Sequence, residues 1–206
     1  EGAARKGGLE MKDGFIKVAA CTPKIKVADV DFNKDKILEQ IKECNDNNVK
    51  VAVFPELCIT GYTCQDLFFQ DTLLDKAMEA FVGIANEVKN YDMLIAVGLP
   101  VKAKGKLFNC AGVINRGKIL CFVPKTHLPN YNEFYEARHF TRGMEETVQV
   151  SLGEEVVPMG KKLLFTCQTM PELKIGVELC EDLWTPEPPS IRHALNGADV
   201  IVNLSA

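Results

Sequence analysis

The sequence predicts an α/β domain in which helices cover one face of a mixed β-sheet. Short β-branched runs alternate with amphipathic helical stretches in the first half of the chain, and a hairpin signal follows them. The 206 residues are enough for one ordinary domain or for part of a larger one. The hydrophobic share of 47% and the charged share of 25% are typical of a globular chain and exclude a disordered or collagen-like one.

Three strands and two helices are predicted in the first hundred residues. The strands are short runs rich in Val, Ile and Ala, and the first helix carries Ile37, Ile41 and Cys44 at helical spacing. In chain order we expect a strand at 15–20, a helix at 31–47, a strand at 49–54, a helix at 71–90 and a strand at 93–99 that ends at Pro100.

The second half of the chain has a different pattern. Asn115-Arg116-Gly117 lies between two apolar runs and predicts a hairpin, whereas residues 125–146 are polar and aromatic with little periodicity, which is typical of an active-site loop. In chain order we expect strands at 107–114 and 118–123, strands at 162–166 and 174–178, a helix within 186–196 and a strand at 200–204.

The two ends of the chain suggest its domain boundaries. Residues 1–10 are rich in Gly, Ala and charge, and we interpret them as an N-terminal extension or an expression remnant. Residues 11–206 form the domain. Because the sequence stops directly after a strand, we expect this domain to be truncated at its C-terminal end.

Charge and cysteine usage restrict the class of partner. The formal net charge of −4 offers no basic field for nucleic acid and no polybasic patch for a membrane surface, and no apolar stretch is long enough to span a bilayer. The eight cysteines contain no CxxC pair and the three histidines have no zinc spacing, so no metal site is expected. We expect reduced thiols and a cytoplasmic protein without a secretory signal peptide.

Three residues that are suited to chemistry each follow an apolar strand: Glu56, Lys125 and Cys180. Ligands of α/β sheets bind outside the carboxyl ends of the strands, so these side chains could meet in one crevice. A carboxylate can take the proton of a thiol, and an ammonium can stabilise a tetrahedral oxyanion, which suits cleavage of a C–N bond through a thioester. From spacing alone, a buried packing cysteine and two solvated turns remain alternative interpretations.

The sequence segments around these three residues resemble the motifs of a known superfamily. Residues 54–62, 125–129 and 176–184 resemble the three catalytic motifs of the nitrilase (carbon–nitrogen hydrolase) superfamily, in the same order, and the resemblance extends from about residue 15 to the end. The flanks at 63–68, at 128–136 and at 180–190 are similar to the glutamine-dependent NAD synthetase family. Free-standing amidases of the superfamily tend to carry Cys-Tyr-Asp at the nucleophile, where this chain has Cys180-Glu181-Asp182.

The resemblance implies a nitrilase-type α-β-β-α sandwich that works as a glutaminase. Cys180 would be the nucleophile, Glu56 the general base and Lys125 the oxyanion stabiliser. Glu136 matches the supporting second glutamate better than Glu133 does, because it keeps the family's spacing to Arg138 and Phe140. The residues expected to hold glutamine or to line its pocket are Tyr62, Tyr131, Glu181 and Ser205. Among the remaining residues of the motifs, Cys58 and Cys64 are expected to be structural and Trp184 to be a packing anchor.

The resemblance also implies partners beyond this segment. Ammonia from L-glutamine would pass to an ATP-dependent synthetase domain, which uses Mg²⁺ and amidates deamido-NAD. No phosphate-binding loop occurs in these 206 residues, so that domain is expected outside them, and no cofactor is expected on this one. A homo-oligomer is expected from the family. The alternatives are a free-standing amidase that releases ammonia to solvent and a non-catalytic scaffold with the same fold.

Overall fold

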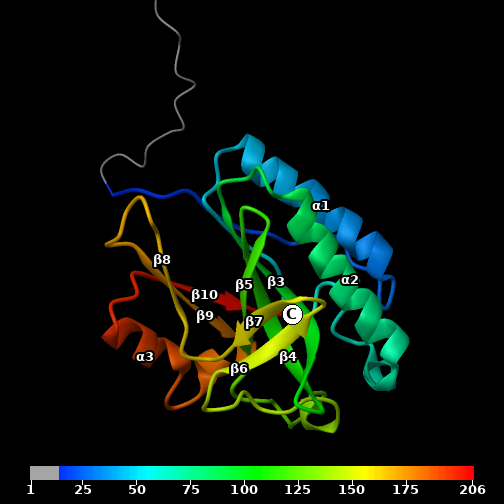
Figure 1. The fold of residues 1–206 in the computed structure, drawn as a ribbon. Coiled ribbons are helices and arrows are strands. Elements are labelled where there is room, and N and C mark those ends of the chain that lie inside the picture. The colour runs from blue at the N-terminus through cyan, green and yellow to red at the C-terminus, as the bar shows by residue number, and fades with distance from the viewer. Residues whose placement is uncertain (1–13) are drawn as a thin grey trace, which may run out of the picture.

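The computed structural model describes residues 14–206 and arranges them in four layers (Figure 1). Two helices pack on a seven-stranded sheet, a three-stranded sheet packs on its other face, and a third helix covers the outer side. The expectation of one sheet with helices on one face is therefore wrong, because a second sheet and its helix close the other face. The α-β-β-α sandwich is confirmed. The extension expected at residues 1–10 lies outside the described residues.

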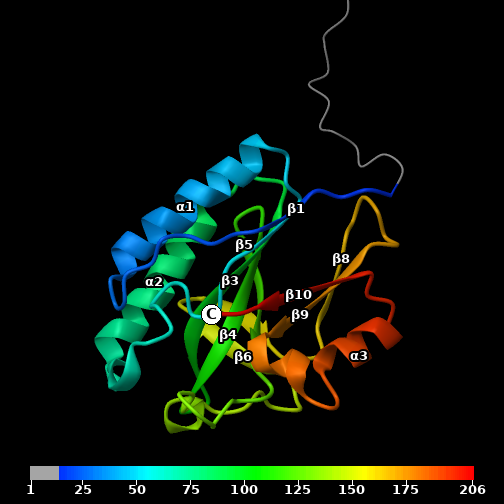
Figure 2. The same cartoon turned by 180° about the vertical axis from the view of Figure 1, so that it is seen from behind.

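The seven-stranded sheet has the order β1-β2-β3-β4-β5-β7-β6. Its strands are β1 (Val18–Ala20), β2 (Val51–Val53), β3 (Leu94–Ala103), β4 (Lys106–Asn115), β5 (Lys118–Pro124), β6 (Val148–Leu152) and β7 (Glu155–Met159). The first three strands are parallel, and the helices α1 (Val30–Asp46) and α2 (Asp71–Glu87) connect them. Both helices lie on the same face of the sheet, as the view from behind also shows (Figure 2).

Strand β3 continues through Pro100 to Ala103, so the prediction that this proline ends the strand is wrong. Pro100 lies opposite Asn109 of β4, and the Asn109 carbonyl accepts a hydrogen bond of 2.8 Å from the backbone N of Lys125, which directly follows β5. The backbone of Asn109 therefore faces β5, and Pro100 removes no hydrogen bond from the β3–β4 ladder.

The hairpins of this sheet differ in how well the sequence predicts them. The β4–β5 hairpin is confirmed, and its turn residues Arg116 and Gly117 both have positive φ, as a type I′ turn requires. The β6–β7 hairpin was not predicted, because its strands are short and partly exposed.

The three-stranded sheet has the order β10-β9-β8. Its strands are β8 (Leu164–Thr166), β9 (Lys174–Leu179) and β10 (Val200–Leu204). Helix α3 (Pro189–Leu195) packs on β9, where a Cβ at Gly176 would lie only 2.8 Å from the His193 ring. Glycine therefore permits the close approach of this helix to the sheet.

Two apolar cores hold the layers together. One lies between α1, α2 and the larger sheet, where the rings of Phe81 and Phe122 are 5.6 Å apart. The other lies between the two sheets and includes Val113, Val123 and Val177. Because this second core packs β5 against β9, the carboxyl ends of strands from different sheets meet at one edge of the molecule.

Candidate active site

Glu56, Lys125 and Cys180 come together at this edge. Glu56 lies three residues after β2, Lys125 directly follows β5 and Cys180 directly follows β9. Glu56 and Lys125 are buried, with 1% and 0% of their surfaces exposed, and Lys125 Nζ donates to Glu56 Oε1 at 2.6 Å. Cys180 is half-buried, and the charges of Glu56 and Lys125 both act on the pKa of its thiol.

Lys125 is held between two carboxylates. Its ammonium also donates to Glu136 Oε1 at 2.6 Å, and the same oxygen accepts a hydrogen bond of 2.7 Å from the Tyr62 hydroxyl. Glu136 is buried, whereas Glu133 is exposed, so the geometry favours Glu136 as the supporting glutamate.

The loop at 125–146 is anchored beside Glu136. Glu136 opens a short 3₁₀ helix, η2 (Glu136–Arg138). Arg138 binds Asp66 through two hydrogen bonds of 2.7 and 2.8 Å, and Phe140 packs on Phe68 with ring centroids 4.9 Å apart. These contacts give a physical reason why the spacing from Glu136 to Arg138 and Phe140 identifies the buried glutamate.

The electrostatics of the buried site favour proton transfer. Burial raises the pKa of Glu56, and the neighbouring Lys125 opposes that rise. Burial disfavours the Lys125 ammonium, yet Glu56 and Glu136 overcome it and raise the pKa of Lys125. Lys125 therefore stays charged, while the raised pKa makes Glu56 a stronger base than an exposed glutamate.

Free acceptor atoms gather around the same residues. Within residues 14–206, Glu56 Oε2, Glu136 Oε2 and Asn109 Oδ1 are buried and have no hydrogen-bond partner. Buried polar atoms are normally paired, so unpaired ones in a cluster indicate a place where a substrate or water binds. Glu56 Oε2 is thus free to accept the proton of a thiol.

Cys180 has a strained backbone at the tip of its turn. Its φ is 40°, in the left-handed region that β-carbon-bearing residues avoid, and it begins the 3₁₀ helix η3 (Cys180–Trp184). Burial and the charge of Glu56 raise the pKa of the thiol, while Lys125 and the Ser205 side chain lower it. The resting group is a thiol, so attack on a substrate requires a base.

The four residues predicted to bind substrate lie in this turn or around it. The Tyr131 hydroxyl donates to Glu181 Oε2 at 2.9 Å, and Tyr131 is 50% exposed. The Tyr62 hydroxyl lies on Glu136, and Ser205 donates to Asn203 Oδ1 at 2.7 Å and acts on the Cys180 thiol. Tyr131, Glu181 and Ser205 therefore form an open polar rim next to Glu56, Lys125 and the half-buried Cys180, while the binding roles stay predictions.

The structure also bears on the roles expected for Cys58, Cys64 and Trp184. Cys58 and Cys64 are buried and donate to backbone carbonyls, which fits the structural role, and all eight cysteines, which lie within residues 14–206, are free thiols. The role of Trp184 as a packing anchor is wrong for the described chain, since 76% of its surface is exposed.

Asn109 is a site residue that the sequence reading missed. Its side chain is fully buried and its Nδ2 donates to Glu56 Oε1 at 2.6 Å. The available signal was a single amide within the apolar run at 107–114. A buried amide in a strand requires partners, so it marks a polar cluster at that point of the sheet.

Replacing Asn109 with alanine is expected to lower the amide hydrolysis that the family resemblance implies by about 10- to 100-fold, since a hydrogen bond to a charged group contributes about 1.5–3 kcal/mol. The lost donor also raises the pKa of Glu56, so the acid limb of the pH–rate profile should move to higher pH. Asn115→Ala is the control, because Asn115 Nδ2 binds Met93 O at the other end of the same strand. Equal pH profiles for wild type and Asn109→Ala would contradict the assignment.

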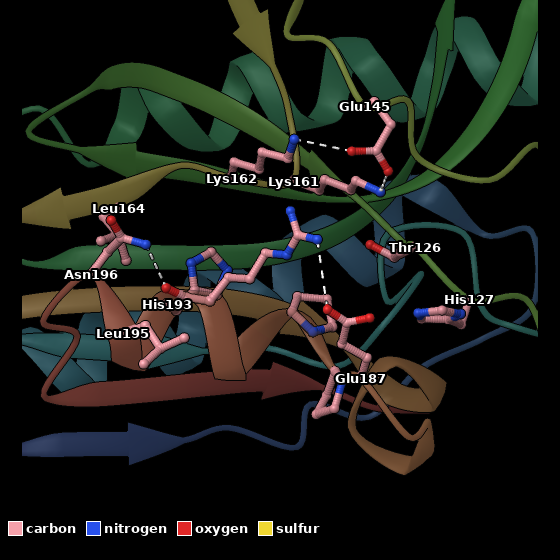
Figure 3. A pocket seen from close by; sticks show the side chains of 13 residues that line it. Thr126, His127, Glu145, Lys161, Lys162, Leu164, Glu187, His193, Leu195 and Asn196 are labelled. Carbon is pink, nitrogen blue, oxygen red and sulfur yellow. Dashed lines mark hydrogen bonds and ion pairs between the residues drawn. The ribbon is translucent and has the colours of Figure 1, made fainter.

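A separate cavity of about 570 Å³ lies between α3 and the segments that follow β5 and β7 (Figure 3). Lys161 and Lys162 pair with Glu145 there, and Arg192 lies 3.7 Å from Glu187. Glu56, Lys125 and Cys180 do not line this cavity. Because its cations already face carboxylates, we give it no role in the reaction.

The described residues contain no helix that could cross a membrane.

Comparison with known proteins identifies relatives of this chain. The Glutamine-dependent NAD(+) synthetase of Mycobacterium bovis is 39% identical over 93% of the chain, and the human one is 31% identical over 92%. The chain spans about 28% of the length of these relatives.

Solved structures of other proteins have a fold similar to that of this chain. The glutamine-dependent NAD(+) synthetase of Cytophaga hutchinsonii has a TM-score of 0.80 and 30% identity, with 93% of this chain and 30% of that chain covered. An amidase of the nitrilase superfamily from Nesterenkonia has a TM-score of 0.71 and 17% identity, with 96% and 68% covered, and shows the fold alone. The carbon–nitrogen hydrolase family model matches residues 17–206. The chain therefore belongs to the carbon–nitrogen hydrolase family.

Proposed function

We propose that residues 11–206 are an incomplete glutamine amidohydrolase domain of a glutamine-dependent NAD synthetase. The observation that carries the proposal is the buried Lys125, held at 2.6 Å from both Glu56 and Glu136 beside the strained Cys180. The sequence identity to NAD synthetases over most of the chain supports glutamine as the amide substrate.

The first half-reaction forms a thioester. Glu56 takes the Cys180 proton, the thiolate attacks the side-chain amide carbon of glutamine, and the oxygen becomes a tetrahedral oxyanion that the Lys125 ammonium stabilises. Glu56 then gives its proton to the leaving nitrogen, and ammonia departs as the C–N bond breaks. Glu136 and Tyr62 keep Lys125 in place during this step.

The second half-reaction hydrolyses the thioester. Glu56 takes a proton from a water molecule, which attacks the thioester carbonyl, and the second oxyanion again lies against Lys125. Collapse of this intermediate releases glutamate and returns the thiolate, which recovers its proton from Glu56. These steps use side chains of this domain alone.

The open rim suits the amino-acid end of the substrate. The Glu181 carboxylate complements the α-ammonium group of glutamine, and the hydroxyls of Tyr131 and Ser205 supply further hydrogen bonds. Tyr62 lines the pocket between this rim and Lys125.

The remainder of the natural polypeptide completes the proposed reaction. Ammonia passes to an ATP-dependent synthetase domain, where Mg²⁺-ATP activates deamido-NAD and NAD forms. We propose a homo-oligomeric, cytoplasmic enzyme, and the free thiols of the described chain suit a reducing compartment. A free-standing amidase is not favoured, because its structural likeness rests on 17% identity.

The test uses the full natural polypeptide with ATP and deamido-NAD, supplied with glutamine or with ammonium. Cys180→Ala should abolish NAD formation from glutamine and leave formation from ammonium unchanged, because the change removes one half-buried thiol. Cys167→Ala is the control, since Cys167 is a half-buried thiol that follows β8.

Two results would contradict the proposal. NAD formation from glutamine by Cys180→Ala would remove Cys180 as nucleophile. If the wild type forms no NAD from either nitrogen source but still hydrolyses an amide, the free-standing amidase is the better assignment.

A further inference from the structure

Asp182 is a buried carboxylate to which the reaction above gives no role. It lies two residues after Cys180, and only 1% of its surface is exposed. Its oxygens accept hydrogen bonds from the backbone N–H groups of His127 at 2.7 Å, Thr126 at 3.0 Å and Leu179 at 3.2 Å. Both oxygens are therefore occupied, so Asp182 is not a candidate for general acid or base.

The three donors come from two different sheets. Thr126 and His127 follow Lys125 at the end of β5, in the seven-stranded sheet, whereas Leu179 is the last residue of β9, in the three-stranded sheet. Asp182 thus connects the segment that carries the oxyanion lysine to the turn that carries the nucleophile. The buried core between the two sheets consists of apolar side chains, and apolar contacts are not directional.

We propose that Asp182 is a positioning residue that fixes Lys125 relative to Cys180 across the interface between the two sheets. The inference rests on the proposed glutaminase function, since it assigns a positioning task within that reaction. A displacement of about 1 Å between reacting groups lowers a rate about 100-fold, so a rigid connection at this point affects turnover directly.

The chemistry of the connection explains why an ionised carboxylate stands there. Three backbone N–H donors need acceptors here. A carboxylate offers two acceptor oxygens, whereas an amide side chain offers one oxygen and places an NH₂ donor where the second oxygen would be. Burial raises the pKa of Asp182 to about 6, although the three N–H groups oppose the rise. Retaining a charge at such a position is unfavourable for stability, which supports a role in function.

The test compares Asp182→Asn with wild type in the full natural polypeptide. The asparagine amide would face at least one N–H with its own NH₂ group, so the two segments should separate. We expect kcat for glutamine hydrolysis to fall about 10- to 100-fold, with KM for glutamine changed less than about twofold. NAD formation from ammonium should stay at the wild-type rate.

Two further variants sharpen the test. Asp199→Asn is the control. The exposed Asp199 accepts a hydrogen bond of 2.9 Å from Lys174 N at the opposite end of β9, so this variant should leave kcat unchanged. Asp182→Glu keeps the charge but adds one methylene, so it should fold and still show a lowered kcat at unchanged KM.

The outcomes separate this inference from the proposed function. If wild type hydrolyses no glutamine, the proposed function fails. If wild type is active and Asp182→Asn keeps its kcat while losing only thermal stability, Asp182 is structural and the inference is overturned. An unfolded Asp182→Asn chain together with a wild-type kcat in Asp182→Glu overturns it as well.

Discussion

Replacing Lys125 with methionine is expected to reduce glutamine hydrolysis at least about 1,000-fold and to destabilise the fold by roughly 3–5 kcal/mol at pH 8. The ammonium is fully buried and is the shared donor to Glu56 and Glu136, so its removal leaves two carboxyl groups facing one another without a cation. Thermal denaturation and glutamine turnover of the full natural polypeptide measure the two effects.

The loss of stability should depend on pH. Burial already raises the pKa of Glu56, and Lys125 is the main group that opposes the rise, so the folded variant should hold a proton on Glu56 that the unfolded chain releases near pH 4.5. Above that pH unfolding then releases a proton, and the free energy of unfolding of the variant falls as pH increases. The difference from wild type should be small at pH 5 and large at pH 8.

A control and a compensating change test this explanation. Lys102→Met removes a half-exposed lysine that pairs with Asp71 and should change stability by less than about 1 kcal/mol. Adding Glu136→Gln to Lys125→Met removes one of the opposed carboxylates and should restore part of the stability at pH 8, but no activity. A pH-independent loss of stability would show that cavity formation, and not charge, dominates.

The elements predicted from periodicity are largely those of the structure. The expected helix at 31–47 forms as Val30–Asp46, because its apolar spacing places Ile37, Ile41 and Cys44 in the core. The second sheet could not be predicted in the same way. Strands of either sheet carry the same apolar runs, and only tertiary packing decides which edge each strand joins.

Part of the candidate site could be predicted from the sequence and part could not. Glu56, Lys125 and Cys180 could be found because each follows an apolar run, and the family resemblance pointed to Glu136. Neither argument reaches Asn109 or the backbone contacts of Asp182, since those depend on two sheets meeting. Long-range hydrogen bonds leave no periodic signal in a sequence.

Replacing Gly98 with alanine is expected to destabilise the fold by about 3 kcal/mol and to lower glutaminase activity about 100-fold. A Cβ at this position of β3 would overlap Leu57 N and Pro55 O, and would lie 2.7 Å from the Glu56 carbonyl carbon. These are backbone atoms of the segment that holds Glu56, the proposed general base, so no side chain can rotate away to make room.

The backbone around this contact cannot move away from the added Cβ without breaking hydrogen bonds. Leu57 has a φ of 52°, in the left-handed region. The turn is bonded to β3 on both sides of the clash, because Phe54 N donates to Ala96 O at 2.9 Å and Ile59 N donates to Gly98 O at 3.2 Å. Gly83→Ala is the matched control. Its Cβ would meet only the flexible end of Lys34 at 3.2 Å, and alanine within α2 should stabilise the helix by up to about 1 kcal/mol. Wild-type activity in Gly98→Ala would mean that the Glu56 segment moves freely, and the rigid placement of Glu56 against Lys125 could then not be the basis of its acid–base role.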